Sequence, residues 1–150
     1  MKQEQTIRKL TDYLLLNACS VEAPGLYEGK AGLSLVLFET AQYFQEEEIE
    51  NKAFQLLQEA LIDKNKNCHF ENGLSGIGYV LLYLIENKFV DADFDEIFKE
   101  KYEEIISSFE NIEKDPLRLV NSLQVIYFLT KVRNLKHEDS RPGDIMKKIF

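Results

Sequence analysis

The sequence predicts an all-α protein built from repeated helical hairpins. A Gly-x-x-Gly motif occurs twice, and Gly29 and Gly73 are 44 residues apart, as are Gly32 and Gly76. A period of this size is typical of repeated helical hairpins. Apolar residues also recur at helical spacing along almost the whole chain, and sustained alternation with period two is hard to find. Together these observations favour helices over strands throughout.

The first half of the chain is expected to contain three helices. The first carries four apolar residues on one stripe, namely Ile7, Leu10, Leu14 and Ala18. The second, from about Lys30 to Phe44, turns three apolar residues inward, namely Ala31, Leu35 and Phe38. The run Glu46–Glu48 is expected to be a solvated turn or helix start rather than a ligand cluster. A third helix over 49–61 repeats the apolar spacing with Ile49, Ala53, Leu56 and Ala60.

The second half is expected to contain three longer helices and a short last one. After a polar connector at 63–67, a helix begins near Gly73. Asp93 and Glu96 have the spacing of a capping box for the next helix, whose buried face should comprise Phe94, Ile97, Phe98, Tyr102, Ile105 and Phe109. Asp115-Pro116 is an N-cap followed by proline, typical of a helix start. Pro142 repeats this signal before a short helix over Ile145–Phe150.

The helices alternate in character, which predicts two layers. The helices that follow the glycine motifs are apolar nearly all round and suit an inner layer, whereas 49–61 and 94–109 carry charge on one face and suit an outer layer. A third repeat is expected at position 117, where Leu117 and Val120 stand in place of the two glycines. We therefore expect about three hairpins.

The composition limits the classes of function. A length of 150 residues is common for one domain, so residues 1–150 should form a single domain. The 18 basic residues are scattered and outnumbered by 26 acidic ones, which argues against nucleic acid as a partner. The longest apolar stretch, Ile77–Ile85, is too short for the roughly 20 residues of a membrane span, so no membrane partner is expected. Two cysteines without a signal peptide predict reduced thiols in a cytoplasmic protein.

Four glycines are the main candidate site residues: Gly29, Gly32, Gly73 and Gly76. Glycine at a helix start permits positive φ, lets other backbone segments approach closely, and leaves the first helical N–H groups uncovered. If such helix starts converge, their dipoles favour an anion between them. The alternative is that the glycines only allow tight turns and close helix packing. The residues alone leave both interpretations open.

Cys68-His69 is the one pair that suggests a metal. A zinc site needs three or four ligands, and Cys19 and His137 are the other soft candidates in the chain. A Cys-His catalytic dyad is not expected either, because adjacent side chains usually diverge. We therefore expect no metal and no other cofactor, and we assign no catalytic residue.

The glycine motifs carry a family resemblance. Residues 25–33 and 70–78 closely resemble the first repeats of lanthionine synthetase C-like proteins, over roughly residues 20–100. The resemblance implies an α/α toroid, in which helices opened by Gly-x-x-Gly form an inner ring inside an outer one; about half of a toroid is expected here. In family members that are enzymes, zinc held by two cysteines and a histidine activates a peptide cysteine for addition to dehydroalanine or dehydrobutyrine.

The resemblance carries over the four glycines as structural motifs lining the centre of the toroid, but no zinc ligand. It places the family's ligands in later repeats, beyond the end of this chain. Two of them are an adjacent Cys-His directly before a Gly-x-x-Gly, where this chain has Tyr27-Glu28 and Glu71-Asn72. Cys68-His69 lies three residues earlier than Glu71-Asn72. The prediction is a non-catalytic module that binds a peptide or partner protein in peptide maturation.

Two alternatives remain: half of a split zinc-dependent thioether-forming cyclase completed by another chain, or a generic helical-repeat interaction module. The sixth helix has too many apolar groups for one buried stripe: Leu119, Val120, Leu123, Val125, Ile126, Tyr127, Phe128 and Leu129. Such a surface should be covered. A homodimer of two half-toroids is the expected solution. The other possibilities are that a complementary chain covers it or that the segment Ile145–Phe150 folds back as a cap.

Overall fold

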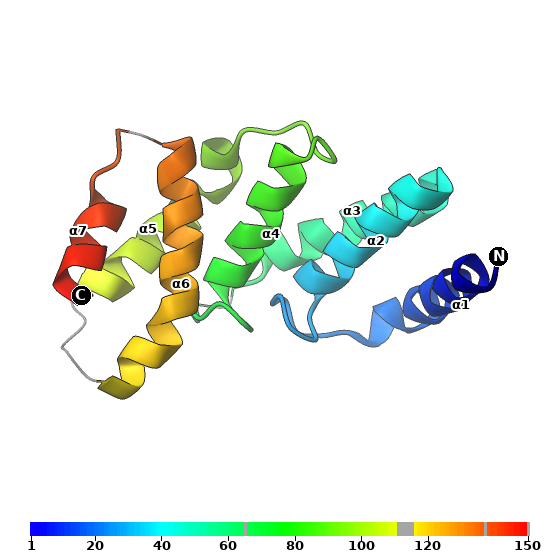
Figure 1. The fold of residues 1–150 in the computed structure, drawn as a ribbon, viewed down its shortest axis with the longest axis horizontal. Coiled ribbons are helices and arrows are strands. Elements are labelled where there is room, and N and C mark those ends of the chain that lie inside the picture. Colours follow the sequence, from blue (N-terminus) through cyan, green and yellow to red (C-terminus); the bar gives the residue numbers. More distant parts are fainter. Residues whose placement is uncertain (65, 111–115, 137, 150) are drawn as a thin grey trace.

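The computed structural model of the chain describes residues 1–64, 66–110, 116–136 and 138–149 (Figure 1). Side chains are described for the same residues except 110 and 116–121. Apart from the short 3-10 helix η1 (Ala18–Ser20), the regular elements in this part are α-helices. They are α1 (Lys2–Asn17), α2 (Lys30–Phe44), α3 (Glu47–Ile62), α4 (Leu74–Glu86), α5 (Phe94–Glu110), α6 (Pro116–Leu135) and α7 (Arg141–Ile149). The predicted all-α fold is confirmed.

The helices form two layers, as predicted, and each hairpin has one helix in each layer. Figure 1 shows α2, α4 and α6 next to one another in one layer, where α4 packs against both neighbours. Each of them pairs with the helix that follows it, giving the hairpins α2–α3, α4–α5 and α6–α7. The inner helices α2 and α4 begin at Lys30 and Leu74, 44 residues apart like the glycine motifs, and α6 begins 42 residues further on, at Pro116. This arrangement is the toroid-like repeat that the sequence predicts.

Small residues bring α2 and α3 close together. Ala31 on α2 and Ala53 on α3 are fully buried. Their small side chains let the helices approach until the Ser34 hydroxyl donates to the Ala53 carbonyl oxygen at 2.7 Å. A buried serine costs stability unless it is hydrogen-bonded, so this contact allows a polar residue inside the core. All four residues predicted on the buried stripe of α3 are buried: Ile49, Ala53, Leu56 and Ala60.

The ends of the outer helices follow the predicted capping signals. Glu46 precedes α3, and three glutamates lie in its first turn, where the helix dipole favours negative charge. At α5 the Asp93 carboxylate accepts hydrogen bonds from the N–H groups of Asp95 and Glu96, at 2.8 and 3.1 Å. The predicted buried face of α5 is correct except at Ile97, which is 42% exposed. Ile97 lines a surface cavity between α3 and α5 instead of the core.

Helix α1 packs differently from the prediction. Leu10, expected on the apolar stripe, is 58% exposed, whereas Thr11 is buried and donates its hydroxyl to the Ile7 carbonyl oxygen at 2.9 Å. The reason is that α1 lies at the edge of the array and is held by a few contacts. The Arg8 guanidinium donates to the Glu46 carboxylate, with Nη1 and Oε2 2.7 Å apart, and lies 3.9 Å from the centre of the Phe44 ring.

The end of the chain covers one side of α6. As predicted, α6 begins at Pro116. It buries Val125, Phe128 and Leu129, and Ile126 is 7% exposed. Asp115 and the side chains of Leu117, Leu119 and Val120 lie outside the described residues. Leu123 and Tyr127 remain about half exposed. Helix α7 begins at Arg141 rather than Ile145, because the Asp139 carboxylate caps the Arg141 N–H at 3.0 Å. It packs on α5 and α6 and buries Ile145.

None of the described helices is both long enough and apolar enough to span a membrane.

Candidate functional site

Two glycine loops precede the first two inner helices and share one geometry. We define the first glycine loop as residues 23–32 and the second as residues 67–76, which lie one repeat period apart. A Cβ atom added at Gly32 would lie 1.9 Å from the Leu26 carbonyl oxygen, and one at Gly76 would lie 2.0 Å from that of Phe70. Leu26 and Phe70 are themselves 44 residues apart. The repeat therefore extends to the backbone contacts that make glycine necessary.

The other glycine of each motif is needed for the same reason. A Cβ atom at Gly29 would lie 2.3 Å from the Gly25 carbonyl oxygen, and one at Gly73 would lie 2.2 Å from that of Asn67. No glycine among the described residues has positive φ, whereas Glu28 has φ 54°. The sequence interpretation was wrong about positive φ at these glycines. Close approach of another backbone segment explains them.

The loops also cover the helix starts. The first three N–H groups of α2 donate to carbonyl oxygens of the first glycine loop, at 2.8, 3.2 and 3.3 Å: Lys30 to Ala23, Ala31 to Pro24 and Gly32 to Gly25. At α4, the Leu74 N–H donates to the Asn67 carbonyl oxygen at 2.7 Å. The expectation that these N–H groups are uncovered is wrong for α2, because the loop folds over the end of the helix. The start of α2 thus lacks the free donors that an anion would need.

The two glycine loops bind each other. The N–H groups of Leu26 and Tyr27 donate to the Glu71 carbonyl oxygen at 2.9 and 2.8 Å. With its side-chain nitrogen turned toward the first glycine loop, Asn72 donates to the Tyr27 carbonyl oxygen at 2.9 Å. A Cβ atom at Gly25 would lie 2.5 Å from the Asn72 Cα, so the loops are in direct backbone contact. Glu71 and Asn72 therefore join one repeat to the next.

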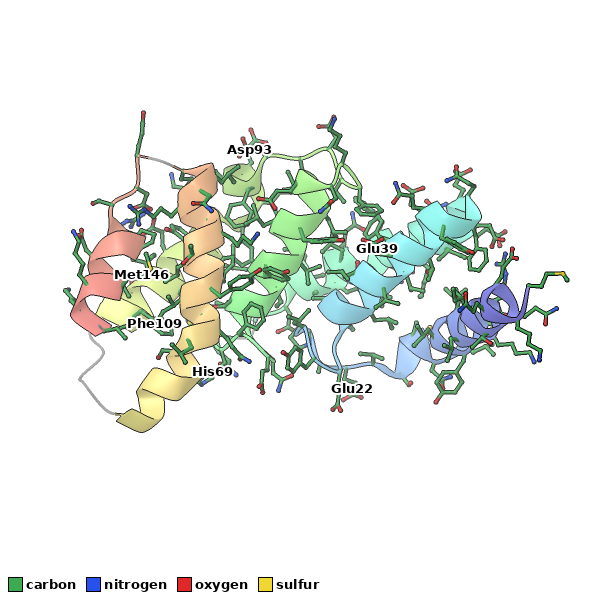
Figure 2. The ribbon with its side chains drawn as sticks, in the orientation of Figure 1. Glu22, Glu39, His69, Asp93, Phe109 and Met146 are labelled. Atoms are coloured by element: carbon green, nitrogen blue, oxygen red, sulfur yellow. The ribbon has the colours of Figure 1, made fainter. Side chains whose placement is uncertain are left out.

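A row of polar and aromatic side chains crosses the inner helices. The Tyr83 hydroxyl on α4 donates to Glu39 Oε1 on α2 at 2.5 Å. Figure 2 labels Glu39. The rings of Tyr79 and Tyr127 lie 5.8 Å apart and join α4 to α6, and the Lys131 ammonium lies 5.8 Å from the Tyr127 ring. We call these five residues the inner row. Ser34 of α2, by contrast, is fully buried and contacts Ala53 of the outer helix α3.

Both inner tyrosines of α4 hold their protons more tightly than a free tyrosine. The hydrogen bond to Glu39 raises the pKa of Tyr83, and partial burial adds to the effect. Partial burial raises the pKa of Tyr79, with a further contribution from Tyr127. Both hydroxyls are therefore neutral at pH 7 and can donate hydrogen bonds.

Sequence reasoning missed the inner row, although the repeat contains the signal. Glu39, Tyr83 and Tyr127 are spaced by 44 residues, the same period as the glycines. Each occupies the same position in its own repeat. Comparing the helices as well as the loops at this period would have singled them out.

The soft candidates for metal binding lie apart. The Cys68 sulfur is 3.6 Å from the Lys66 carbonyl oxygen and 3.8 Å from that of Glu104, while the Cys19 sulfur lies 3.8 Å from the Lys52 ammonium on α3. His69 is exposed, and His137 lies outside the described residues. No group of three His, Cys, Asp or Glu side chains among the described residues is arranged to hold a metal ion.

The hairpins with equivalent glycine loops define a helical-repeat protein of the α/α type. The family model described as lanthionine synthetase C-like protein matches residues 4–130. The chain therefore belongs to the lanthionine synthetase C-like family. Comparison with curated proteins and with solved structures finds no match.

The zinc ion of the family's enzymes does not fit the described residues. The resemblance places a Cys-His pair directly before the Gly-x-x-Gly of a later repeat, and at the corresponding position of the second repeat Glu71 and Asn72 hold the two glycine loops together. Cys68 has carbonyl oxygens as its polar neighbours. Thiolate and imidazole ligands must converge on one point to bind zinc, and these side chains do not converge.

Proposed function

We propose that this chain is a non-catalytic module of the lanthionine synthetase C-like family that binds a peptide or a partner protein during peptide maturation. The observation that carries the proposal is the role of Glu71 and Asn72. At the position before Gly-x-x-Gly that carries two zinc ligands in a later repeat of the family's enzymes, this repeat has Glu71 and Asn72, which join the glycine loops through the Glu71 carbonyl oxygen and the Asn72 amide. The second glycine loop is thus built for packing rather than for activating a thiol.

The inner row is the proposed binding surface. Tyrosine offers a large apolar ring together with a hydroxyl, which is why it is enriched at protein interfaces. Tyr79 and Tyr83 have hydroxyls that stay neutral at pH 7, and Lys131 adds a cation beside Tyr127. A peptide lying across α4 and α6 would find ring faces for its apolar side chains and the Lys131 ammonium as a hydrogen-bond donor for its carbonyl groups.

Binding and ring closure can be measured on the same substrate. The probe is a synthetic peptide that carries one cysteine and one dehydrobutyrine. We expect isothermal titration calorimetry to detect binding, and mass spectrometry to detect thioether formation no faster than in buffer. Tyr127→Ala should weaken binding about tenfold, since aromatic residues dominate interface energies. Tyr13→Ala, at an exposed tyrosine of α1, is the matched control and should bind like the wild type.

The zinc content of the purified protein decides between binding and catalysis. We expect substoichiometric zinc by elemental analysis. One tightly held zinc per chain that is lost on Cys68→Ala, with ring closure faster than in buffer, would refute the proposal and restore a catalytic role. Binding that responds equally to Tyr127→Ala and Tyr13→Ala would contradict the assignment to the inner row.

A further inference from the structure

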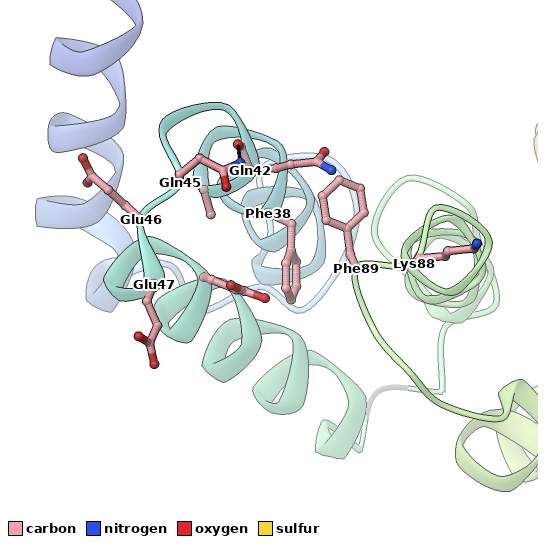
Figure 3. A pocket seen from close by; sticks show the side chains of 9 residues that line it. Phe38, Gln42, Gln45, Glu46, Glu47, Lys88 and Phe89 are labelled. Carbon is pink, nitrogen blue, oxygen red and sulfur yellow. Dashed lines mark hydrogen bonds between the residues drawn. The ribbon is translucent and has the colours of Figure 1, made fainter.

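Two adjoining cavities open beside α3, at the end of α2 opposite its glycine loop. The first has a volume of about 520 Å³ and lies between the end of α2, the start of α3 and the loop that follows α4 (Figure 3). The second, of about 390 Å³, continues along α3 toward the start of α5. Phe38, Glu50 and Phe89 line both cavities, so the two form one groove. We call it the α3 groove.

The floor of the α3 groove is aromatic. The rings of Phe38 and Phe89 are tilted by 51° to each other, with their centres 5.9 Å apart. Figure 3 shows both rings at the first cavity. Phe54 lines the second cavity and remains 43% exposed. Exposed aromatic rings bind apolar side chains and also the cations of lysine and arginine.

The rim of the α3 groove is acidic. Glu47 and Glu50 line the first cavity, and Asp91 joins Glu50 along the second. All three are exposed, and within the part of the chain that the structure describes none of them forms an ion pair. Lys88 also lines the first cavity, but Figure 3 shows its side chain directed away from Phe38 and Glu47. The rim therefore presents negative charge that the protein leaves unpaired.

The loop on one side of the α3 groove has a fixed conformation. Lys88 has φ 62°, and the N–H groups of Phe89 and Val90 both donate to the Leu84 carbonyl oxygen, at 2.9 and 3.3 Å. Further along, the Lys101 ammonium donates to the Asp63 carbonyl oxygen at 2.9 Å and ties α5 to the end of α3. These contacts hold the walls in place, so a ligand does not have to order them.

We propose that the α3 groove binds a basic segment of a partner protein. An aliphatic or aromatic side chain of that segment packs against Phe89 and Phe54, while lysine or arginine side chains lie beside Glu47, Glu50 and Asp91. A second copy docked symmetrically through the groove would bring its own acidic rim against this one, and the acidic rim repels nucleic acid and anionic lipid. The groove is separate from the inner row, so this proposal does not depend on the proposed function.

Fluorescence anisotropy tests the proposal on the full chain. The probe is a short fluorescein-labelled peptide in which lysine and leucine alternate, compared with the same peptide carrying glutamate for each lysine. We expect the lysine peptide to bind and the glutamate peptide to bind at least about tenfold more weakly. Binding of the lysine peptide should weaken between about 0.01 M and 0.15 M ionic strength, over which the screening length falls from about 30 Å to 8 Å.

Matched variants locate the binding. The double variant Glu47→Gln, Glu50→Gln should lose affinity about fivefold or more. Glu48→Gln, Glu100→Gln changes the net charge equally at exposed glutamates that line neither cavity, and should bind like the wild type. Phe54→Ser tests the floor without altering charge, with Ile62→Ser as its control at another exposed apolar residue of α3.

Three results would overturn the proposal. The first is equal loss of affinity in the two glutamate double variants, which indicates a general effect of net charge. The second is unchanged binding in both Glu47→Gln, Glu50→Gln and Phe54→Ser. The third is concentration-dependent self-association of the wild type that Phe54→Ser abolishes, which would make a second copy the occupant of the groove.

Discussion

The Tyr83 hydroxyl donates to the Glu39 carboxylate at 2.5 Å, and the two residues occupy the same position in successive repeats. Tyr127 occupies that position in the third repeat. This one position of the repeat is therefore a glutamate in α2 and a tyrosine in both α4 and α6. The hydrogen bond between the first two repeats is therefore formed by side chains at equivalent positions of the two repeats.

Replacing Tyr83 by phenylalanine should remove this contact and little else. We expect Tyr83→Phe to lower the free energy of unfolding by about 1 kcal/mol, the usual contribution of one hydrogen bond. Urea denaturation measures the change. Tyr43→Phe, at an exposed tyrosine of α2, is the control and should leave the midpoint unchanged. Equal stability of Tyr83→Phe and the wild type would mean that the bond to Glu39 contributes nothing in solution.

Gly76 should tolerate no side chain, because a Cβ atom there would lie 2.0 Å from a backbone oxygen. Gly76→Val should cost roughly 1–3 kcal/mol through overpacking or a strained backbone. Gly143 in α7 offers a contrast, since a Cβ atom there would meet its nearest neighbour, an Arg133 nitrogen, at 3.7 Å. Gly143→Ala should therefore be neutral or stabilising. An unchanged melting temperature for Gly76→Val would show that the second glycine loop is not tight.

Arg141 should stabilise the attachment of α7 in a pH-dependent way. Its guanidinium donates to the Glu103 carboxylate at 2.6 and 2.9 Å, and to Asp139 at 3.0 Å. These hydrogen bonds lower the pKa of both carboxyls below their ordinary values of 4.5 and 3.8. A lowered carboxyl pKa stabilises the fold above the unfolded pKa, and this contribution is lost as the pH falls through the folded pKa.

The expected measurement compares Arg141→Ala with the wild type across pH. At pH 7 the variant should be less stable by about 1 kcal/mol, a value typical of a partly exposed ion pair with good geometry. The difference should begin to shrink as the pH falls through the ordinary carboxyl pKa values of 4.5 and 3.8, and should disappear only as the pH falls through the lower pKa values of the folded state. Lys147→Ala removes a more exposed ion pair of the same helix and should show no such profile. A difference that stays constant down to acidic pH would contradict the role of the two carboxylates.

The oligomeric state tests what covers α6. Leu123 stays 48% exposed although α7 covers another side of this helix. We expect a homodimer at micromolar concentration by light scattering, and a monomer for Leu123→Glu. A wild-type monomer would mean that α7 alone provides the cover that α6 needs.

The sequence alone predicted correctly those features of the fold that depend on residues close together in the chain. The range of α2, the capping of α5 by Asp93 and the buried stripe of α3 are all set by nearby residues, and all match the structure. Leu10 and Ile97 were assigned to buried faces and are exposed, because burial depends on whether a neighbouring element covers that side. Sequence periodicity contains no information about which neighbour is missing.

The candidate site was predictable only in part. The four glycines follow from their spacing, but the reason for them depends on the path of each loop back over its own helix. The α3 groove depends on the position of Phe89, which is set by the left-handed turn at Lys88 and the bonds to the Leu84 carbonyl oxygen. Neither feature has a local sequence signal.

The hydrogen bonds from the Leu26 and Tyr27 N–H groups to the Glu71 carbonyl oxygen affect how the protein unfolds. They are backbone bonds, so they link the first two hairpins whatever side chains stand at these positions. Opening of the second glycine loop would release both amides of the first. Hydrogen exchange at Leu26 and Tyr27 should therefore proceed at the rate set by the more weakly held hairpin, and the first two repeats should unfold as one cooperative unit.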